Sequence, residues 1–210
     1  MENTTIQSQS LKKGWELRDV IMMGVIGVVF AAIYLVSTTL WIALQTALTP
    51  FGLAAFAVEI VYGIWFMAGS LAAFILRKPG TAFTAEFLAA IIEMFMGNFG
   101  GPLVVLFGAI QGAGNEAGFA VFRYRRFGLP AMCMSAILAA VFSFVTEVFT
   151  GSVELLSPGF VLAKLGLRIA SAIAFTGVVC WLCGKALVRT GVLKSYPAGG
   201  DAKPAAILDD

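Results

Sequence analysis

Residues 20–36 read VIMMGVIGVVFAAIYLV and contain no charged side chain. Their length and composition are typical of a helix that crosses a lipid bilayer, because a spanning helix needs about 20 predominantly apolar residues. The run is too long for the apolar region of a signal peptide, and no evident cleavage site separates it from a polar mature domain. We therefore expect this helix to remain in the protein as its first membrane span.

The rest of the chain has the same character. Hydrophobic residues make up 60% of the 210 residues and charged residues only 12%, and the mean hydropathy is +0.92. These values lie outside the range of soluble globular domains. The length accommodates about six spanning helices and leaves little for a soluble domain, so we predict an all-α protein embedded in a lipid bilayer. The expected spans are residues 20–36, 53–76, 82–96, 102–122, 129–149 and 160–182.

Basic residues gather in every second connection between these spans. The other connections carry no Lys or Arg until Lys164, so the positive-inside rule places both termini in the cytoplasm. We expect a cytoplasmic N-terminal segment over residues 1–17, the six-helix domain over 18–194, and a disordered cytoplasmic tail over 195–210, which is small and polar. The basic clusters are Lys12, Lys13 and Arg18, then Arg77 and Lys78, then Arg123, Arg125 and Arg126, and finally Lys185, Arg189 and Lys194.

Polar residues inside the expected spans fall at related depths. Glu59 and Tyr62 lie early in the inward-running second span. Glu93 and Asn98 lie at the end of the outward-running third span, so both pairs are expected near the outer face. The fifth and sixth spans carry polar stripes on their outer halves, because polar residues recur there at helical spacing. The stripes are Ser143, Thr146, Glu147 and Thr150 on the fifth span, and Lys164, Arg168 and Ser171 on the sixth.

The fourth span carries a polar trio near the middle of the membrane. Gln111 and Asn115, four residues apart, share one face, and Glu116 lies about 100° further round the helix. We interpret the trio as a hydrogen-bonding floor beneath a pocket. Glu86 lies seven residues before Glu93, on nearly the same face but about 10 Å nearer the cytoplasm. We therefore expect Glu86 to matter less to a ligand than Glu93.

These buried polar groups predict a pocket that opens to the outside. Ionisable groups at such depths cost about 2.5 to 3.5 kcal/mol each on insertion scales, so by default they line a bundle interior or an aqueous cavity. The alternative is that they hold helices together, through pairs such as Glu147 with Arg168. The candidate ligand-binding residues are Glu59, Tyr62, Trp65, Glu93, Asn98, Gln111, Asn115, Glu116, Glu147 and Arg168.

The charge balance of the outer half favours a cationic or amine-bearing ligand, because pairing with the basic residues cannot neutralise all of the acids unless some are protonated. Tyr62, Trp65 and Trp41 add ring faces, which attract cations and stack on heteroaromatic rings. For Trp41, a place in an interfacial aromatic belt is an equal alternative. The acids counted here are Glu59, Glu93, Glu147 and Glu154, against Lys164 and Arg168.

Small residues at helical spacing indicate close helix packing. Gly24, Gly27 and Ala31 form a smooth strip on the first span, which is either internal packing or a docking face for another membrane protein. The fourth span carries two small-xxx-small pairs, which let neighbouring helices approach closely. These pairs are Gly108 with Gly112, and Gly114 with Gly118.

Several kinds of chemistry lack their residues in this sequence. The chain contains no His, and its CWLC motif at residues 180–183 lies inside an apolar span, so zinc, haem and Ser-His chemistry have no visible site. Neither a Walker A sequence nor a dinucleotide fingerprint of the right spacing is present. The basic clusters form no continuous face, which argues against nucleic acid. We expect a protein that is not an enzyme and holds no cofactor or metal ion.

Five stretches together resemble a known family. Over about residues 15–194, the chain is similar to the substrate-binding S components of energy-coupling factor (ECF) transporters, and within them to the YkoE group. The stretches are VYGIWF at 61–66 preceded by Glu59, RKPG at 77–80, EFLAAIIEMFMGNFGGP at 86–102, IQGAGNEAGF at 110–119 and SPGFVLAKLGLRIASA at 157–172.

The resemblance implies a six-helix protein of a prokaryotic cytoplasmic membrane. Such a protein captures a vitamin at its outer face and joins a transmembrane coupling protein and a pair of ABC ATPases, docking through small residues on its first helix. For the YkoE group, the implied ligand is thiamine or its hydroxymethylpyrimidine moiety. Thiamine carries a permanent thiazolium charge and an aminopyrimidine edge, which suit an acid-rich aromatic pocket with carboxamides.

Two other functions stay open from the residues. A stand-alone proton-coupled small-molecule transporter would use the same buried glutamates as proton carriers. A non-transporting membrane channel or scaffold would use them for helix association.

Overall fold

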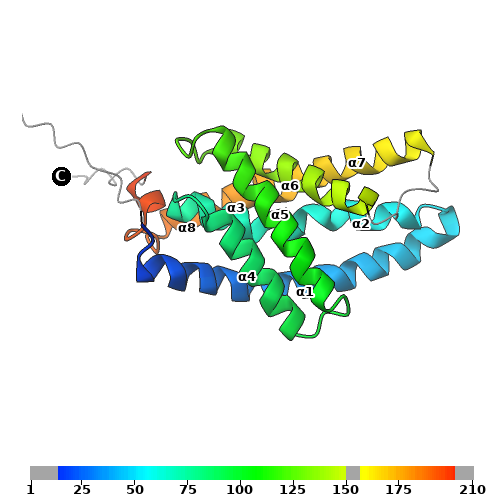
Figure 1. Ribbon diagram of the computed structural model, residues 1–210, viewed down its shortest axis with the longest axis horizontal. Coiled ribbons are helices and arrows are strands. Elements are labelled where there is room, and N and C mark those ends of the chain that lie inside the picture. The colour runs from blue at the N-terminus through cyan, green and yellow to red at the C-terminus, as the bar shows by residue number, and fades with distance from the viewer. Residues whose placement is uncertain (1–13, 150–156, 202–210) are drawn as a thin grey trace, which may run out of the picture.

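The computed structural model describes residues 14–149 and 157–201, and these residues form helices joined by short connections (Figure 1). Two pairs of α-helices continue through an irregular segment as single rods, so the described chain forms six rods. The expected all-α fold with six helices is confirmed. Lys12, Lys13, Thr150, Glu154 and residues 202–210 of the expected tail lie outside the described residues.

The rods follow one another in chain order. The first is α1 (Leu17–Leu48), followed by the short 3₁₀ turns η1 (Thr49–Phe51) and η2 (Ala54–Phe56). The second consists of α2 (Ala57–Val61), the 3₁₀ segment η3 (Tyr62–Phe66) and α3 (Met67–Leu76). The next three are α4 (Thr81–Phe95), α5 (Pro102–Val121) and α6 (Leu129–Phe149). The sixth consists of α7 (Pro158–Ala172), the π-helical segment η4 (Ile173–Val179) and α8 (Cys180–Arg189), and the short turn η5 (Pro197–Asp201) follows it.

Five of the six rods are long and apolar enough to cross a membrane. The exception is α4, whose 15 residues rise only about 22 Å at 1.5 Å per residue. The hydrocarbon core of a bilayer is about 30 Å thick. The connection between α4 and α5 accordingly stops well short of the far ends of α1 and α7, and α4 runs obliquely to α1 (Figure 1). The expected third span is thus a short, tilted helix.

Glycines let α5 pack closely on both of its neighbours, as the small-residue pairs predict. A Cβ atom added at Gly108 would lie 2.2 Å from the Cβ of Ala90 on α4, and one added at Gly118 would lie 2.2 Å from the Cα of Ser135 on α6. Any side chain at these positions would push the helices apart. The other glycine of each pair faces the same neighbouring helix.

The two ends of the described chain meet at one end of the bundle. The Arg18 guanidinium donates to the Ser195 carbonyl at 2.8 Å, and the Tyr196 hydroxyl donates to the Arg18 carbonyl at 3.4 Å. Ala198 is fully buried, and both it and Tyr196 pack on the hydrophobic core. The expectation of disorder is therefore wrong for residues 195–201, because this part of the tail has an apolar anchor.

The arrangement predicts which connections face the outside. A Cys at Thr49, after α1, should react with a membrane-impermeant maleimide in whole cells, because the positive-inside rule places this connection outside. A Cys at Arg126, between α5 and α6, should react only after permeabilisation. Both positions are exposed, and the three native cysteines would be replaced by Ala. The reverse labelling pattern would show that the orientation is inverted.

Candidate ligand-binding pocket

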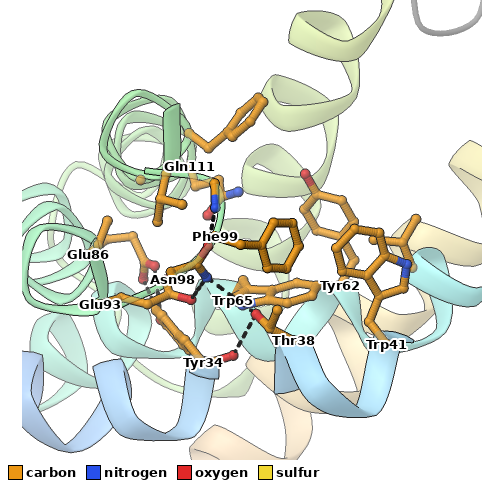
Figure 2. Close-up of a pocket in the computed structure, with 16 residues that line it drawn as sticks. Tyr34, Thr38, Trp41, Tyr62, Trp65, Glu86, Glu93, Asn98, Phe99 and Gln111 are labelled. Carbon is orange, nitrogen blue, oxygen red and sulfur yellow. Dashed lines mark hydrogen bonds between the residues drawn. The ribbon is translucent and has the colours of Figure 1, made fainter. Parts of the chain in front are cut away.

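A cavity of about 250 Å³ lies between α1, α2, η3, α4 and α5, with the connection between α4 and α5 along one side (Figure 2). Typical ligand pockets hold about 300 to 1,000 Å³, so this one suits a small ligand. The described residues that line it include two carboxylates and no Lys or Arg. Its polar lining residues are Tyr34, Thr38, Tyr62, Glu86, Glu93, Asn98 and Gln111, and its other aromatic ones are Trp41, Trp65, Phe99 and Phe107.

Polar and aromatic side chains occupy different sides of the pocket. Figure 2 shows Glu86 and Glu93 on one side and Trp41 and Tyr62 on the other. Trp65 meets both of these rings edge-on, with centroids 6.5 Å from Trp41 and 5.6 Å from Tyr62. A ligand between the two sides would meet carboxylates at one end and ring faces at the other.

The 3₁₀ geometry of η3 explains why Tyr62 and Trp65 act together. Residues three apart eclipse each other in a 3₁₀-helix, whereas the 100° step of an α-helix would separate them by about 60°. Both rings therefore emerge on the same side of η3 and enter the cavity as one aromatic wall.

The turn after α4 brings a carboxamide and a further ring to the pocket. The Asn98 Nδ2 group donates to Glu93 Oε1 at 2.6 Å, and Asn98 Oδ1 accepts the Gly100 N–H at 2.8 Å. Phe99, beside it, stacks on Trp41 with centroids 6.0 Å apart. Asn98 thus fixes both the turn and the Glu93 carboxylate, which borders the cavity.

Glu86 also lines the pocket, although its position seven residues before Glu93 suggested a lesser role. The Tyr34 hydroxyl donates to both Glu86 oxygens at 2.9 and 3.1 Å, and the Gly69 N–H donates at 2.9 Å. Tyr34 accepts the Ala68 N–H at 3.0 Å. The start of α3 therefore holds a buried carboxylate, as the N–H groups and dipole of a helix N-terminus favour. The cavity therefore extends along two turns of α4, from Glu86 to Glu93, whereas the sequence placed only the Glu93 end of this helix beside the ligand.

The three residues of the expected floor lie in different environments. Gln111 lines the cavity, and its carboxamide has no hydrogen-bond partner among the described residues. Asn115 is fully buried elsewhere and donates to the Phe66 carbonyl at 3.0 Å. Glu116 accepts the Gly80 N–H at 2.6 Å and two further N–H groups at the start of α4, so it caps that helix. The expected pocket position is wrong for Asn115 and Glu116. The side chains of both residues form hydrogen bonds with backbone groups outside the cavity.

Glu59 and Glu147 pair with Lys164 and Arg168 in a cluster that we call the ion quartet. The Arg168 Nε and Nη2 atoms donate to the two Glu59 oxygens at 2.6 and 2.9 Å, and Arg168 also donates to Glu147. Lys164 Nζ lies 3.3 Å from Glu59 and 2.5 Å from Glu147. None of the four lines the cavity. The expectation that they do is wrong, because their charges pair with one another and hold helices together.

Two of the three residues in the small-residue strip on α1 face the interior of the bundle. A Cβ at Gly27 would lie 3.3 Å from the Ile92 side chain of α4, and Ala31 is fully buried. Neither residue is open to another protein, so the docking role is wrong for both, and the packing alternative describes them. Gly24 is half-buried, with open space beside it.

Some pocket residues escaped the sequence-based prediction. Tyr34 and Thr38 could have been found from the sequence, because they are polar residues four apart on a predominantly apolar helix and therefore share one face of it. Phe99 could not have been found in this way, since a phenylalanine is ordinary in a membrane protein. Only the turn after α4 brings it to Trp41.

The fold and the pocket define a multi-pass membrane protein with an internal site for a small ligand. Residues 18–142 match the family described as the permease component of ABC-type cobalt transport systems. The chain is 34% identical over 191 residues to the putative HMP/thiamine permease protein YkoE of Bacillus subtilis (strain 168), across 91% of this chain and 94% of that protein. It also matches the crystal structure of an S component of an ECF transporter, with a TM-score of 0.83 and 34% identity over 90% of this chain and 93% of the other.

The chain belongs to the family of ECF transporter S components. The resemblance found in the sequence is confirmed. The protein is therefore a multi-pass membrane component of a bacterial transporter, without a catalytic domain of its own. Membership in this family implies association with the energising module of the transporter.

The pairing in the ion quartet predicts that a single substitution lowers the free energy of unfolding more than the paired substitution does. Arg168→Gln should lower the free energy of unfolding by about 3 to 5 kcal/mol, because it leaves the fully buried Glu59 carboxylate without its main partner. The double variant Glu59→Gln, Arg168→Gln should recover part of this loss. Thermal unfolding in detergent would measure both, with Glu16→Gln of the exposed Glu16–Arg18 pair as a nearly neutral control. Equal losses in the single and double variants would contradict the pairing.

Proposed function

We propose that this S component captures thiamine or its hydroxymethylpyrimidine moiety (HMP) in the pocket. It then delivers the ligand within a complex that contains a transmembrane coupling protein and a pair of ABC ATPases. The observation that carries the proposal is the lining itself, which combines two carboxylates and several ring faces with no basic side chain. The name of the Bacillus subtilis relative, a putative HMP/thiamine permease, supports the same ligands.

The lining residues match the two chemical features of these ligands. The exocyclic amine of the pyrimidine is a donor that a carboxylate such as Glu93 accepts, and the ring nitrogens are acceptors for a carboxamide such as Gln111. The flat rings stack on aromatic side chains, and the thiazolium cation of thiamine is attracted to the faces of Tyr62 and Trp65. No basic side chain in the lining competes with a cationic ligand for these two acidic groups.

Cobalt, which the matching family description names, fits the donor set poorly. The chain has no His, and the described residues hold no group of three or more His, Cys, Asp or Glu that could bind a metal ion. Imidazole and thiolate ligands are the ones that suit most transition metals. The organic cation is the better match to the pocket.

Glu93 gives the most direct test of the ligand site. A hydrogen bond to a charged group contributes about 1.5 to 3 kcal/mol, so Glu93→Gln should weaken binding roughly tenfold or more. Isothermal titration of the detergent-purified protein with thiamine and with HMP would measure this. Glu116→Gln is the matched control, because Glu116 caps α4 outside the cavity and Gln still offers an acceptor. A folded Glu93→Gln variant that binds like the parent would contradict the proposal.

Reconstituted vesicles distinguish the proposed function from the two alternatives. Uptake should require ATP and the complete transporter. Uptake by the chain alone, driven by a pH gradient, would indicate the proton-coupled transporter instead. If the protein binds neither compound saturably, the result would favour the non-transporting channel or scaffold.

A further inference from the structure

Side chains of the sixth rod hold η3 in place from behind the pocket. The Gly63 N–H donates to Ser171 Oγ at 3.0 Å, and the Ser171 hydroxyl donates to the Ile60 carbonyl at 2.8 Å. The Thr176 hydroxyl donates to the Gly63 carbonyl at 2.5 Å. These three bonds satisfy backbone groups on both sides of the point where α2 gives way to η3.

The backbone geometry of both rods makes these bonds feasible. A Cβ atom at Gly63 would lie 2.3 Å from the Ser171 carbonyl oxygen, so the rods touch backbone to backbone there. A π-helix closes its hydrogen bonds over five residues instead of four. Ser171, in the last turn of α7, and Thr176, in η4, are five residues apart and can therefore face the same stretch of η3.

Arg168 holds the aromatic wall from the same direction. Its guanidinium carbon lies 3.8 Å from the centroid of the Tyr62 ring, and 5.0 Å from that of Phe144. The bidentate contact with Glu59 fixes the guanidinium. Tyr62 thus lines the cavity and also contacts the buried guanidinium of Arg168. Arg168 itself is fully buried and does not line the cavity.

We propose that Arg168, Ser171 and Thr176 are positioning residues for the ligand site. They hold η3 in the 3₁₀ conformation that brings Tyr62 and Trp65 into the cavity on one side, and so they set ligand affinity without touching the ligand. This inference rests on the proposed function of the pocket. It replaces a direct contact of Arg168 with the ligand, which the sequence had suggested.

Ser171→Ala and Thr176→Val test the inference, because each removes a bond to η3 while leaving the ion quartet intact. Ser70→Ala is the matched control: Ser70 is also buried, its hydroxyl pairs with that of Ser135 at 2.8 Å and not with a group of η3, and it does not line the cavity. Titration with HMP would give the affinity. Fluorine NMR of protein labelled with 5-fluorotryptophan would report on each of the four Trp residues, with the Trp65 signal assigned through Trp65→Phe.

Thr176→Val removes one buried hydrogen bond and Ser171→Ala removes two. Thr176→Val should therefore bind HMP roughly three- to tenfold more weakly than the parent, and Ser171→Ala at least as weakly as Thr176→Val. In the free protein, each should shift or broaden the Trp65 fluorine signal and leave that of Trp15 unchanged. Ser70→Ala should alter neither the affinity for HMP nor the Trp65 signal. A general loss of stability would not produce this difference between the control and the two test variants.

Two results would overturn the inference. One is an unmoved Trp65 signal in both test variants, and the other is an equal loss of affinity in Ser70→Ala. A parent protein that binds no HMP or thiamine would overturn the proposed function instead. In that case the Trp65 signal of the free protein still decides whether the sixth rod positions the wall.

Discussion

The lipid bilayer offers no hydrogen-bond partner to a backbone amide, and the binding pocket depends on how the chain meets this constraint. A membrane protein can interrupt a helix only where other protein groups or the water of a cavity satisfy the released N–H and C=O groups. In this chain the second rod changes from α to 3₁₀ geometry at Tyr62, and the hydroxyls of Ser171 and Thr176 serve the backbone on both sides of the change. The aromatic wall exists because this interruption is supported.

The neighbours of each buried glutamate decide whether it has a structural or a ligand-binding role. Glu59 meets Arg168 and Lys164, so its charge is balanced and it holds helices together. Glu93 meets a neutral carboxamide and borders the cavity, where its carboxyl group remains available to a ligand. Both are buried glutamates. Their separation into structural and ligand-facing groups gives the pocket an acidic lining, while the ion quartet pairs two acidic with two basic side chains.

The shortness of α4 leaves space for the pocket. Because α4 is too short to cross the bilayer core and runs obliquely, the turn that follows it lies against the cavity instead of at the far end of the bundle. Glycines on α5 keep that helix close to both α4 and α6. Close packing around the pocket and free space within it are therefore produced by the same pair of helices.

The sequence by itself determined the membrane location, the six helices, the glycine faces of α5 and the family, because apolar length, charge alternation and small-residue spacing are properties of local stretches. It also identified Tyr62, Trp65, Glu93, Asn98 and Gln111, which the structure brings to one cavity. Only the tertiary structure decided which glutamates pair with cations, that Asn115 and Glu116 bond to backbone groups, and that Glu86 and Phe99 reach the pocket. Helical spacing gives the direction of a side chain about its own axis, whereas its partner depends on the tilt and register of the neighbouring helix.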